Sequence, residues 1–340
     1  MSGNRIERSV SEQFHVEELL DSLKRGRLLL SDGGLATELE AQGEDLTQGK
    51  LWSARLLLDK PEAIARVHHE YLMSGCDIIT TSSYQATIDG FTETGLSATQ
   101  SASLLRKSID IARDARTAFI GSYHPCASIT PVIAASIGCY GASLADGSEF
   151  RGDYKLNGDQ LKDFHRKQLK VLSECNPDLI AFETVPCSIE AIAIAELLRD
   201  EFPHLKAWIS FSCNQKGINN GDDFAHAVES LQGYEQIIAI GINCTSPEYV
   251  TDLLKSCHAR IKPFIVYPNK GEKWNEGENR TDKASQRLCA VERKWEGNGR
   301  ERQLCEYIEE WKCHGAQIFG GCCRTRPQDM SLMRKRLDQY

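Results

Sequence analysis

The feature that most constrains the fold is a regular alternation of short apolar runs with amphipathic segments. Eight runs rich in β-branched and other apolar residues recur along the 340 residues, and we predict a strand for each. The predicted strands are 27–31, 78–82, 118–122, 178–182, 207–212, 237–242, 264–268 and 317–320. Between them, apolar residues at three- and four-residue spacing predict helices over 62–74, 98–116, 160–175, 188–199, 247–258 and 302–314.

Near-continuous apolar strands that alternate with helices are typical of a parallel sheet covered on both faces. Eight such units predict a closed (β/α)8 barrel of the α/β class, the TIM-barrel architecture, as a single domain over 1–340. An open doubly wound sheet is less consistent with the chain, which lacks the glycine-rich G-x-G-x-x-G turn. Residues 1–25 are expected to form an N-terminal extension or helix.

Two connections are predicted to be long. The segments 131–158 and 271–299 are rich in Gly, Asp, Glu and Asn. Long loops inside a compact domain are often lids or binding loops, and both would follow strands and rise over the barrel mouth. The alternative is that they are disordered decoration.

Composition narrows the class of partner. The formal net charge is −8 and no Lys/Arg-rich run is present, which argues against nucleic acid or an anionic membrane and favours a small-molecule ligand. The N-terminus has no apolar signal core, and no run is long enough for a membrane span, so a soluble cytoplasmic protein is expected. The oligomeric state is not predicted. The thirteen cysteines, an odd number in a long chain, are expected to be reduced.

Several of these cysteines lie where a barrel carries its chemistry, at the carboxyl ends of the strands. Cys322 and Cys323 follow two glycines after the eighth predicted strand, and Cys244 ends the sixth. Alternate strands of such a barrel aim side chains at the same interior layer. Three thiolates there would form a soft site suited to zinc, with one tetrahedral position open.

The pattern leaves alternatives for these thiols. Most free cysteines are simply small buried apolar residues. Cys126, Cys187 and Cys213 also lie near predicted strand ends, and His314 is a candidate fourth ligand.

Two acidic residues also follow predicted strands. Glu183 comes after an apolar run and would stand at the mouth, where it could bind a ligand or form an ion pair on the rim. Asp32 could cap a helix that begins near Leu35, and such a helix end can hold a carboxylate.

At these residues the chain resembles the homocysteine S-methyltransferase family, especially its short members that use S-methylmethionine or S-adenosylmethionine. The resemblance spans nearly the whole chain, and the paired cysteines are its most specific part. The matching segments are DGGLATEL at 32–39, SYQA at 83–86, DGSEFRGDY at 146–154, FET at 182–184, GINC at 241–244, YPN at 267–269 and GGCC at 320–323.

The resemblance implies an enzyme that transfers a methyl group to the thiol of homocysteine with one zinc ion per chain. It selects Cys244, Cys322 and Cys323 as the metal ligands. It also implies that Glu183 binds the substrate ammonium, and it adds five further homocysteine-binding residues. These are Asp32, Gly33, Thr81, Asn243 and Asn269. The assignment of Thr81 competes with its neighbours Thr80 and Ser82.

The donor is expected to be a sulfonium, with S-methylmethionine favoured over S-adenosylmethionine. Betaine-dependent members have a longer C-terminal arm and cobalamin-dependent members continue into further modules, for which the sequence leaves no room after Tyr340. Tyr84 and Trp274 are candidates to hold the sulfonium by cation–π contact, although either could simply pack. The alternatives are a non-catalytic zinc- or amino-acid-binding barrel, or a methyltransferase that uses betaine.

Overall fold

The computed structural model describes residues 10–46, 52–122, 129–258, 261–271, 273–275, 294–296 and 302–340, and these form the predicted (β/α)8 barrel. Eight parallel strands pair in the order β1-β12-β9-β8-β5-β4-β3-β2, and a parallel bridge between Ser31 and Ile78 joins the two ends. The barrel strands are β1 (Leu29–Leu30), β2 (Ile78–Thr80), β3 (Val132–Gly138), β4 (Leu179–Val185), β5 (Ala207–Phe211), β8 (Ile237–Asn243), β9 (Phe264–Tyr267) and β12 (Ala316–Phe319).

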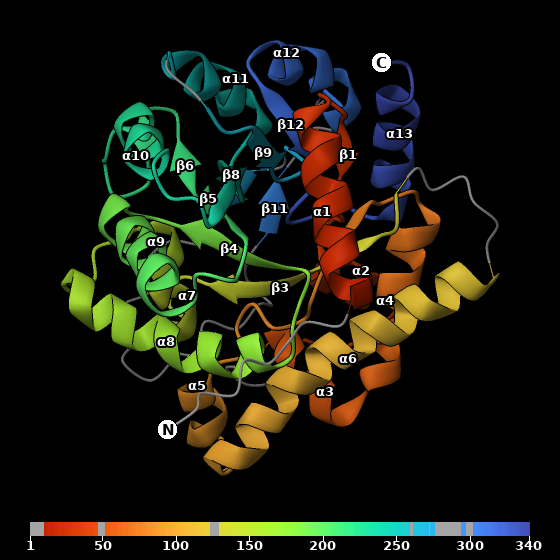
Figure 1. Cartoon of the computed structure of the whole chain (residues 1–340), viewed down its shortest axis with the longest axis vertical. Coiled ribbons are helices and arrows are strands. Elements are labelled where there is room, and N and C mark those ends of the chain that lie inside the picture. The colour runs from red at the N-terminus through yellow and green to blue at the C-terminus, as the bar shows by residue number, and fades with distance from the viewer. Residues whose placement is uncertain are drawn as a thin grey trace.

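Helices surround the strands (Figure 1). The α-helices are α1 (Val10–Lys24), α2 (Leu35–Ala41), α3 (Leu56–Asp59), α4 (Pro61–Met73), α5 (Ile88–Glu93), α6 (Ala98–Ser122), α7 (Tyr140–Leu144), α8 (Gly158–Glu174), α9 (Ser188–Glu201), α10 (Phe224–Leu231), α11 (Pro247–Ser256), α12 (Ile308–Cys313) and α13 (Pro327–Leu337). Short 3-10 turns are η1 (Trp52–Arg55), η2 (Ser148–Phe150) and η4 (Leu304–Glu306), and two small hairpins pair β6 (Cys213–Asn214) with β7 (Gly217–Ile218) and β10 (Lys273–Asn275) with β11 (Lys294–Glu296).

The apolar core has two parts because side chains alternate along each strand. One set faces outward and packs against the helices, forming the larger cluster. The other set fills the barrel interior and is joined by three residues of α1, namely Val16, Leu19 and Leu23. Helix α1 crosses the barrel in Figure 1 and covers the inward-facing core. Part of the predicted N-terminal extension is therefore a helix that belongs to the barrel's core.

The prediction for the third strand is wrong. Residues 118–122 form the last turns of α6, which buries Ala112, Ala115 and Phe119 on one face at helical spacing. The third strand is instead β3, a fully buried run that lies inside the segment 131–158 predicted as a loop. The connection after the third strand therefore begins at Cys139 and contains α7 and η2. Of the second predicted loop, 271–299, most lies outside the described residues.

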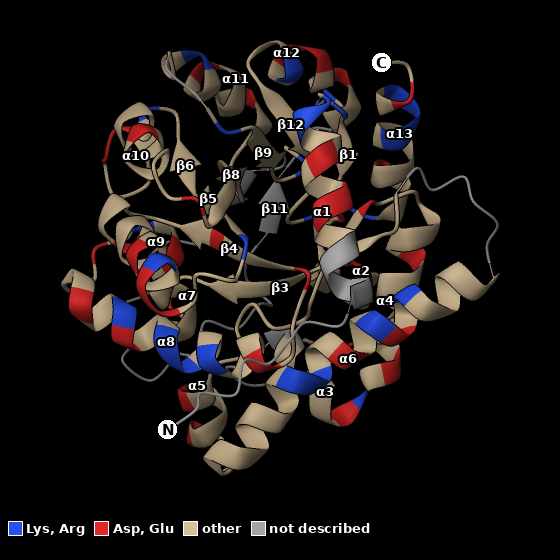
Figure 2. Cartoon of the chain, viewed as in Figure 1, with Lys and Arg blue, Asp and Glu red and all other residues tan. Residues whose placement is uncertain are grey.

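Charge follows the same layering. In Figure 2 acidic and basic residues alternate along the outer helices, whereas the barrel strands carry very few of either. Helices that cross a membrane are long and apolar, and none of the helices in the described ranges meets both conditions.

Substitution of Gly241 tests the pairing of β8 with β9. A Cβ atom at this position would lie 1.7 Å from the carbonyl oxygen of Ile265 on the neighbouring strand. We expect Gly241→Ala to lower the free energy of unfolding by about 3 kcal/mol, because this overpacking pushes β8 and β9 apart. Gly233→Ala is the control, since nothing lies within 4 Å of its Cβ position. Chemical denaturation measures both, and equal midpoints would contradict the strand register.

Candidate functional site

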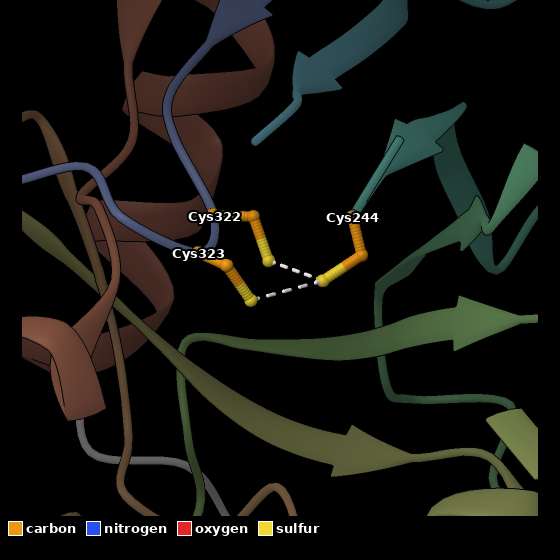
Figure 3. A group of neighbouring side chains, drawn as sticks. All are labelled: Cys244, Cys322 and Cys323. Atoms are coloured by element: carbon orange, nitrogen blue, oxygen red, sulfur yellow. Dashed lines mark hydrogen bonds between the residues drawn. The ribbon is translucent and has the colours of Figure 1, made fainter. Parts of the chain in front are cut away.

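Three cysteines meet at the carboxyl ends of β8 and β12. Cys244 directly follows β8, whereas Cys322 and Cys323 lie on the turn after β12 (Figure 3). The Sγ atom of Cys244 lies 2.7 Å from that of Cys322 and 3.7 Å from that of Cys323. All three sulfur atoms lie within 4.8 Å of one another and are half-buried. Residues 78 positions apart in the chain thus form one cluster.

Backbone geometry directs these thiols toward one another. Cys244 has a left-handed φ of 47°, an unfavourable conformation for a residue with a side chain and one that is often found at functional sites. The amide of Cys322 donates to the carbonyl of Pro268 at 2.8 Å, and the amide of Cys323 donates to Oδ1 of Asn269 at 3.2 Å. A glycine at 34 is required because a Cβ there would lie 2.6 Å from the carbonyl oxygen of Cys322.

The donor set fits a tetrahedral soft metal. Zinc–sulfur bonds of about 2.3 Å place two tetrahedral ligand sulfurs roughly 3.8 Å apart. The 3.7 Å between Cys244 and Cys323 matches that spacing, and the 2.7 Å between Cys244 and Cys322 would have to open by about 1 Å. Three protein thiols leave the fourth position available for another ligand.

The thiols are electrostatically coupled. Hydrogen bonds from Cys244 and Cys322 lower the pKa of Cys323 well below its usual range. Hydrogen bonding to Cys322 and Cys323, together with burial, raises the pKa of Cys244. Three thiolates this close repel one another, so full ionisation of the cluster requires a cation.

Glu183 lies on β4 inside the mouth and is 8% exposed. Its carboxylate accepts a hydrogen bond from the Ser136 hydroxyl on β3, a neutral partner, which differs from the rim ion pair considered from sequence. Burial raises the pKa of Glu183 to about 7, against the opposing effect of Ser136. A carboxyl group with a raised pKa in a buried mouth is suited to receive a cationic ligand group.

Asp32 follows β1 and is 3% exposed. It accepts hydrogen bonds from the amide of Thr80 at 2.8 Å and from the Thr80 hydroxyl at 3.1 Å. The residue before α2 is Gly34, and no side chain caps that helix, so the capping role considered for Asp32 is absent. Burial raises the pKa of Asp32 to about 8, and the charge of Glu183 adds to the effect. The two carboxyl groups therefore share one electrostatic environment.

Three of the other predicted homocysteine-binding residues make contacts within the protein. Thr81 accepts from the amide of Ser136 at 3.0 Å. Asn243 accepts from the amide of Thr184 at 2.8 Å and donates to its hydroxyl at 2.9 Å, which holds Thr184 at a φ of 60°. Asn269 supports Cys323 as described above. These contacts position neighbours of the site.

Of the two donor candidates, Tyr84 alone lies with its side chain among the described residues. Tyr84 lies near the cluster: burial raises its pKa, and the neighbouring Cys139, Glu149 and Cys244 add to the effect. The backbone of Trp274 lies on β10, and its side chain is outside the described residues.

The other metal-ligand candidates lie elsewhere or are not described. Cys187 precedes α9 and Cys213 lies on β6, and neither belongs to the group of three that the described part of the chain contains. His314 directly follows α12 and lies before β12 rather than after it. Cys126 falls outside the described residues.

The sequence alone did not identify several residues that hold the site together. Ser136 was not identified because its strand was predicted as a loop. Thr325 was not considered, yet its hydroxyl donates to the carbonyl of Cys322 at 2.7 Å and accepts from the amide of Gly34 at 3.1 Å. The Tyr267 hydroxyl accepts from Trp208 Nε1 at 3.0 Å, and Tyr267 was visible only as part of the YPN segment.

Comparison with known proteins identifies relatives over nearly the whole length. A family model described as "Homocysteine S-methyltransferase" matches residues 29–337. "Homocysteine S-methyltransferase" of Escherichia coli (strain K12) is 40% identical, covering 96% of this chain and all of that protein. "Selenocysteine Se-methyltransferase" of Brassica oleracea var. italica is also 40% identical, covering 95% of this chain and 92% of that protein.

A solved structure agrees with both fold and family. The crystal structure of the homocysteine methyltransferase MmuM from Escherichia coli in its metallated form superposes with a TM-score of 0.79 at 37% identity. The superposition covers 94% of this chain and 99% of that chain.

The raised pKa of Glu183 predicts a stability effect that depends on pH. A carboxyl whose folded pKa lies above its unfolded value stabilises the fold below about pH 4.5, and this contribution is lost as pH rises through about 7. In the metal-free protein we therefore expect Glu183→Gln to be more stable than wild type at pH 8 by about 3 kcal/mol, and to lose this advantage at pH 4. Urea unfolding at both pH values measures the difference. Glu229→Gln, at an exposed position of α10, is the control, and a pH-independent difference at Glu183 would contradict the argument.

Proposed function

This chain belongs to the homocysteine S-methyltransferase family and transfers methyl groups to homocysteine, and we propose that its donor is S-methylmethionine and its cofactor one zinc ion. In this proposal Cys244, Cys322 and Cys323 hold the zinc. The observation that carries it is the convergence of three thiols within 4.8 Å at the barrel mouth. The E. coli relative has a metallated form, which supports a metal cofactor for this chain.

The zinc ion would act on the acceptor, the thiol of homocysteine. Bound zinc would keep the homocysteine thiol ionised at neutral pH, where a free thiol of pKa near 8.5 is only a few per cent ionised, a gain of roughly thirtyfold or about 2 kcal/mol. Enzymes typically lower barriers by about 8 kcal/mol or more. Most of the barrier reduction therefore has to come from the protein's own residues, through orientation of the two substrates and exclusion of water.

We propose that Glu183 and Asp32 receive the amino-acid end of homocysteine, with the Gly33 backbone beside them. Both carboxyl groups are buried with raised pKa values, which means that their charged forms lack a compensating cation. A substrate ammonium would supply that charge and return the pKa of Glu183 toward its ordinary range. Thr81, Asn243 and Asn269 then act by holding the walls of the site.

The charge of the site favours a cationic donor. A sulfonium approaches a cluster of thiols and carboxyl groups favourably, and its positive charge disappears when the methyl group leaves. We propose that Tyr84, whose pKa is raised by burial and by the neighbouring Cys139, Glu149 and Cys244, faces the donor, where a cation–π contact would contribute about 0.5–2 kcal/mol. Betaine as donor and a barrel that binds without catalysis are the alternatives that the experiment must separate.

Zinc content tests the ligand assignment. We expect about one zinc per chain in the wild-type protein and almost none in Cys322→Ser or Cys323→Ser, because a hydroxyl is a poor replacement for a thiolate. Cys213→Ser is the control, since this buried thiol lies outside the cluster. Elemental analysis after dialysis gives the ratio. Full zinc content in all three cluster variants, including Cys244→Ser, would refute the assignment.

A donor panel tests the reaction. With homocysteine as acceptor, we expect methionine formation to be fastest with S-methylmethionine, slower with S-adenosylmethionine and absent with betaine. Because one relative is named for selenocysteine, that acceptor belongs in the panel. Homocysteine binding without turnover on any donor would favour the non-catalytic barrel, and activity with betaine would overturn the donor proposal.

A further inference from the structure

The connection between β3 and α8, residues 139–157, packs against the carboxyl ends of two barrel strands. The Ser212 hydroxyl, just after β5, donates to the carbonyl of Glu149 at 2.9 Å. At Gly152 a Cβ atom would lie 2.7 Å from the carbonyl oxygen of Pro186, which follows β4. Turn η2 is thus packed against the carboxyl ends of β4 and β5, the same end of the barrel as the cysteines.

This connection carries a carboxylate to the site. Glu149 is half-buried, and its Oε2 atom is inaccessible to solvent. The connection folds back on itself, because a Cβ atom at Gly141 would lie 2.6 Å from the amide nitrogen of Glu149, and the amide of Gly138 at its start donates to the carbonyl of Tyr84 at 3.0 Å. The Glu149 carboxylate also contributes, after burial and Cys139, to the raised pKa of Tyr84. Glu149 therefore lies near Tyr84, the proposed donor aromatic, at the end of the barrel that carries the cysteines.

A single buried carboxylate fastens both ends of the connection. Glu190 on α9 accepts from the amide of Tyr140 at 2.6 Å and from the hydroxyl of Tyr154. Its Oε1 atom also lies 2.8 Å from Nε2 of His165 on α8, and both side chains are fully buried. The rings of Tyr140 and Tyr154 pack edge to face with centroids 5.0 Å apart. One buried network thus holds both ends of the connection that carries Glu149.

The chemistry of methyl transfer indicates what Glu149 can usefully bind. A carboxylate paired with the sulfonium itself would lose its partner in the transition state, because that charge disappears, and would stabilise the ground state more than the transition state. An ammonium group keeps its charge throughout the reaction. S-methylmethionine and S-adenosylmethionine both carry one, and Glu183 is already assigned to the ammonium of the acceptor.

Building on the function proposed above, we propose that Glu149 binds the α-ammonium group of the methyl donor, and that Glu190 is the positioning residue that holds Glu149 over the site. The donor amino-acid end would then lie on the η2 side of the mouth. The acceptor amino-acid end would lie on the Glu183 side. The two substrates are thereby distinguished by two carboxylates on different strand connections.

The test compares S-methylmethionine with its deaminated analogue, (3-carboxypropyl)dimethylsulfonium, in the zinc-loaded protein. Loss of one charged hydrogen bond typically costs tenfold or more, so we expect Glu149→Gln to raise KM for S-methylmethionine by roughly tenfold to a hundredfold. KM for homocysteine and zinc content should stay unchanged. With the deaminated analogue, wild type and Glu149→Gln should perform alike. Calorimetric binding of S-methylmethionine should weaken by the same factor.

Matched variants separate this role from general effects. Asp153→Asn removes a charge from an exposed position on the same connection and should change neither KM. Tyr154→Phe removes one anchor of the connection and should raise the donor KM while leaving the homocysteine KM unchanged. Glu149→Asp should restore part of the donor affinity.

The outcomes are distinct. If Glu149→Gln raised KM equally for S-methylmethionine and for its deaminated analogue, or raised KM for homocysteine, the assignment of Glu149 would be overturned. The proposed function would remain intact. If the wild-type enzyme used only S-adenosylmethionine, the same comparison with that donor and its deaminated form would apply. A wild-type enzyme that is inactive with every sulfonium would overturn the proposed function and this inference together.

Discussion

The site depends on hydrogen bonds that continue beyond the ends of three neighbouring strands. Asn269 donates its amide to the carbonyl of Thr245 at 3.0 Å, which extends the pairing of β9 with β8. On the other side of β9, Cys322 donates to Pro268 at 2.8 Å and Lys270 donates to Cys323 at 3.2 Å, which extends the pairing of β9 with β12. Strand β9 contributes no thiol, yet it sets the separation between Cys244 and the vicinal pair.

Several features of the barrel mouth lower the stability of the fold. Asp32 and Glu183 are buried with raised pKa values, and Cys244 and Thr184 adopt left-handed backbone conformations that most residues avoid. Such features destabilise a fold unless a ligand compensates for them, and they are typical of functional sites. A metal cation at the thiols and an ammonium at the carboxyl groups would each relieve one of these costs.

The outer network around Glu190 serves a different purpose. It lies behind β3 and β4, between the barrel and helices α8 and α9, and has no direct place in the reaction. The network holds both ends of the connection that carries Glu149. It thereby fixes a segment that has little regular secondary structure of its own. A buried carboxylate is costly unless every partner is in place, so such a network favours a single arrangement of the connection.

The local sequence determined the barrel and its chemistry, because both depend on signals that are close together in the chain. Alternating apolar runs and helical periodicity predicted seven of the eight strands, and the GGCC segment resembled the family through a run of only four residues. The third strand was misplaced because residues 118–122 are apolar enough for a strand but continue the buried face of α6. The family resemblance selected Cys244, Cys322 and Cys323, but only the tertiary structure brings their sulfur atoms together. It also decided that Thr80 bonds Asp32, and that Glu149 lies at the carboxyl ends of β4 and β5. Each of these depends on closure of the sheet, which brings residues dozens to hundreds of positions apart within a few ångströms, a distance that no local pattern encodes.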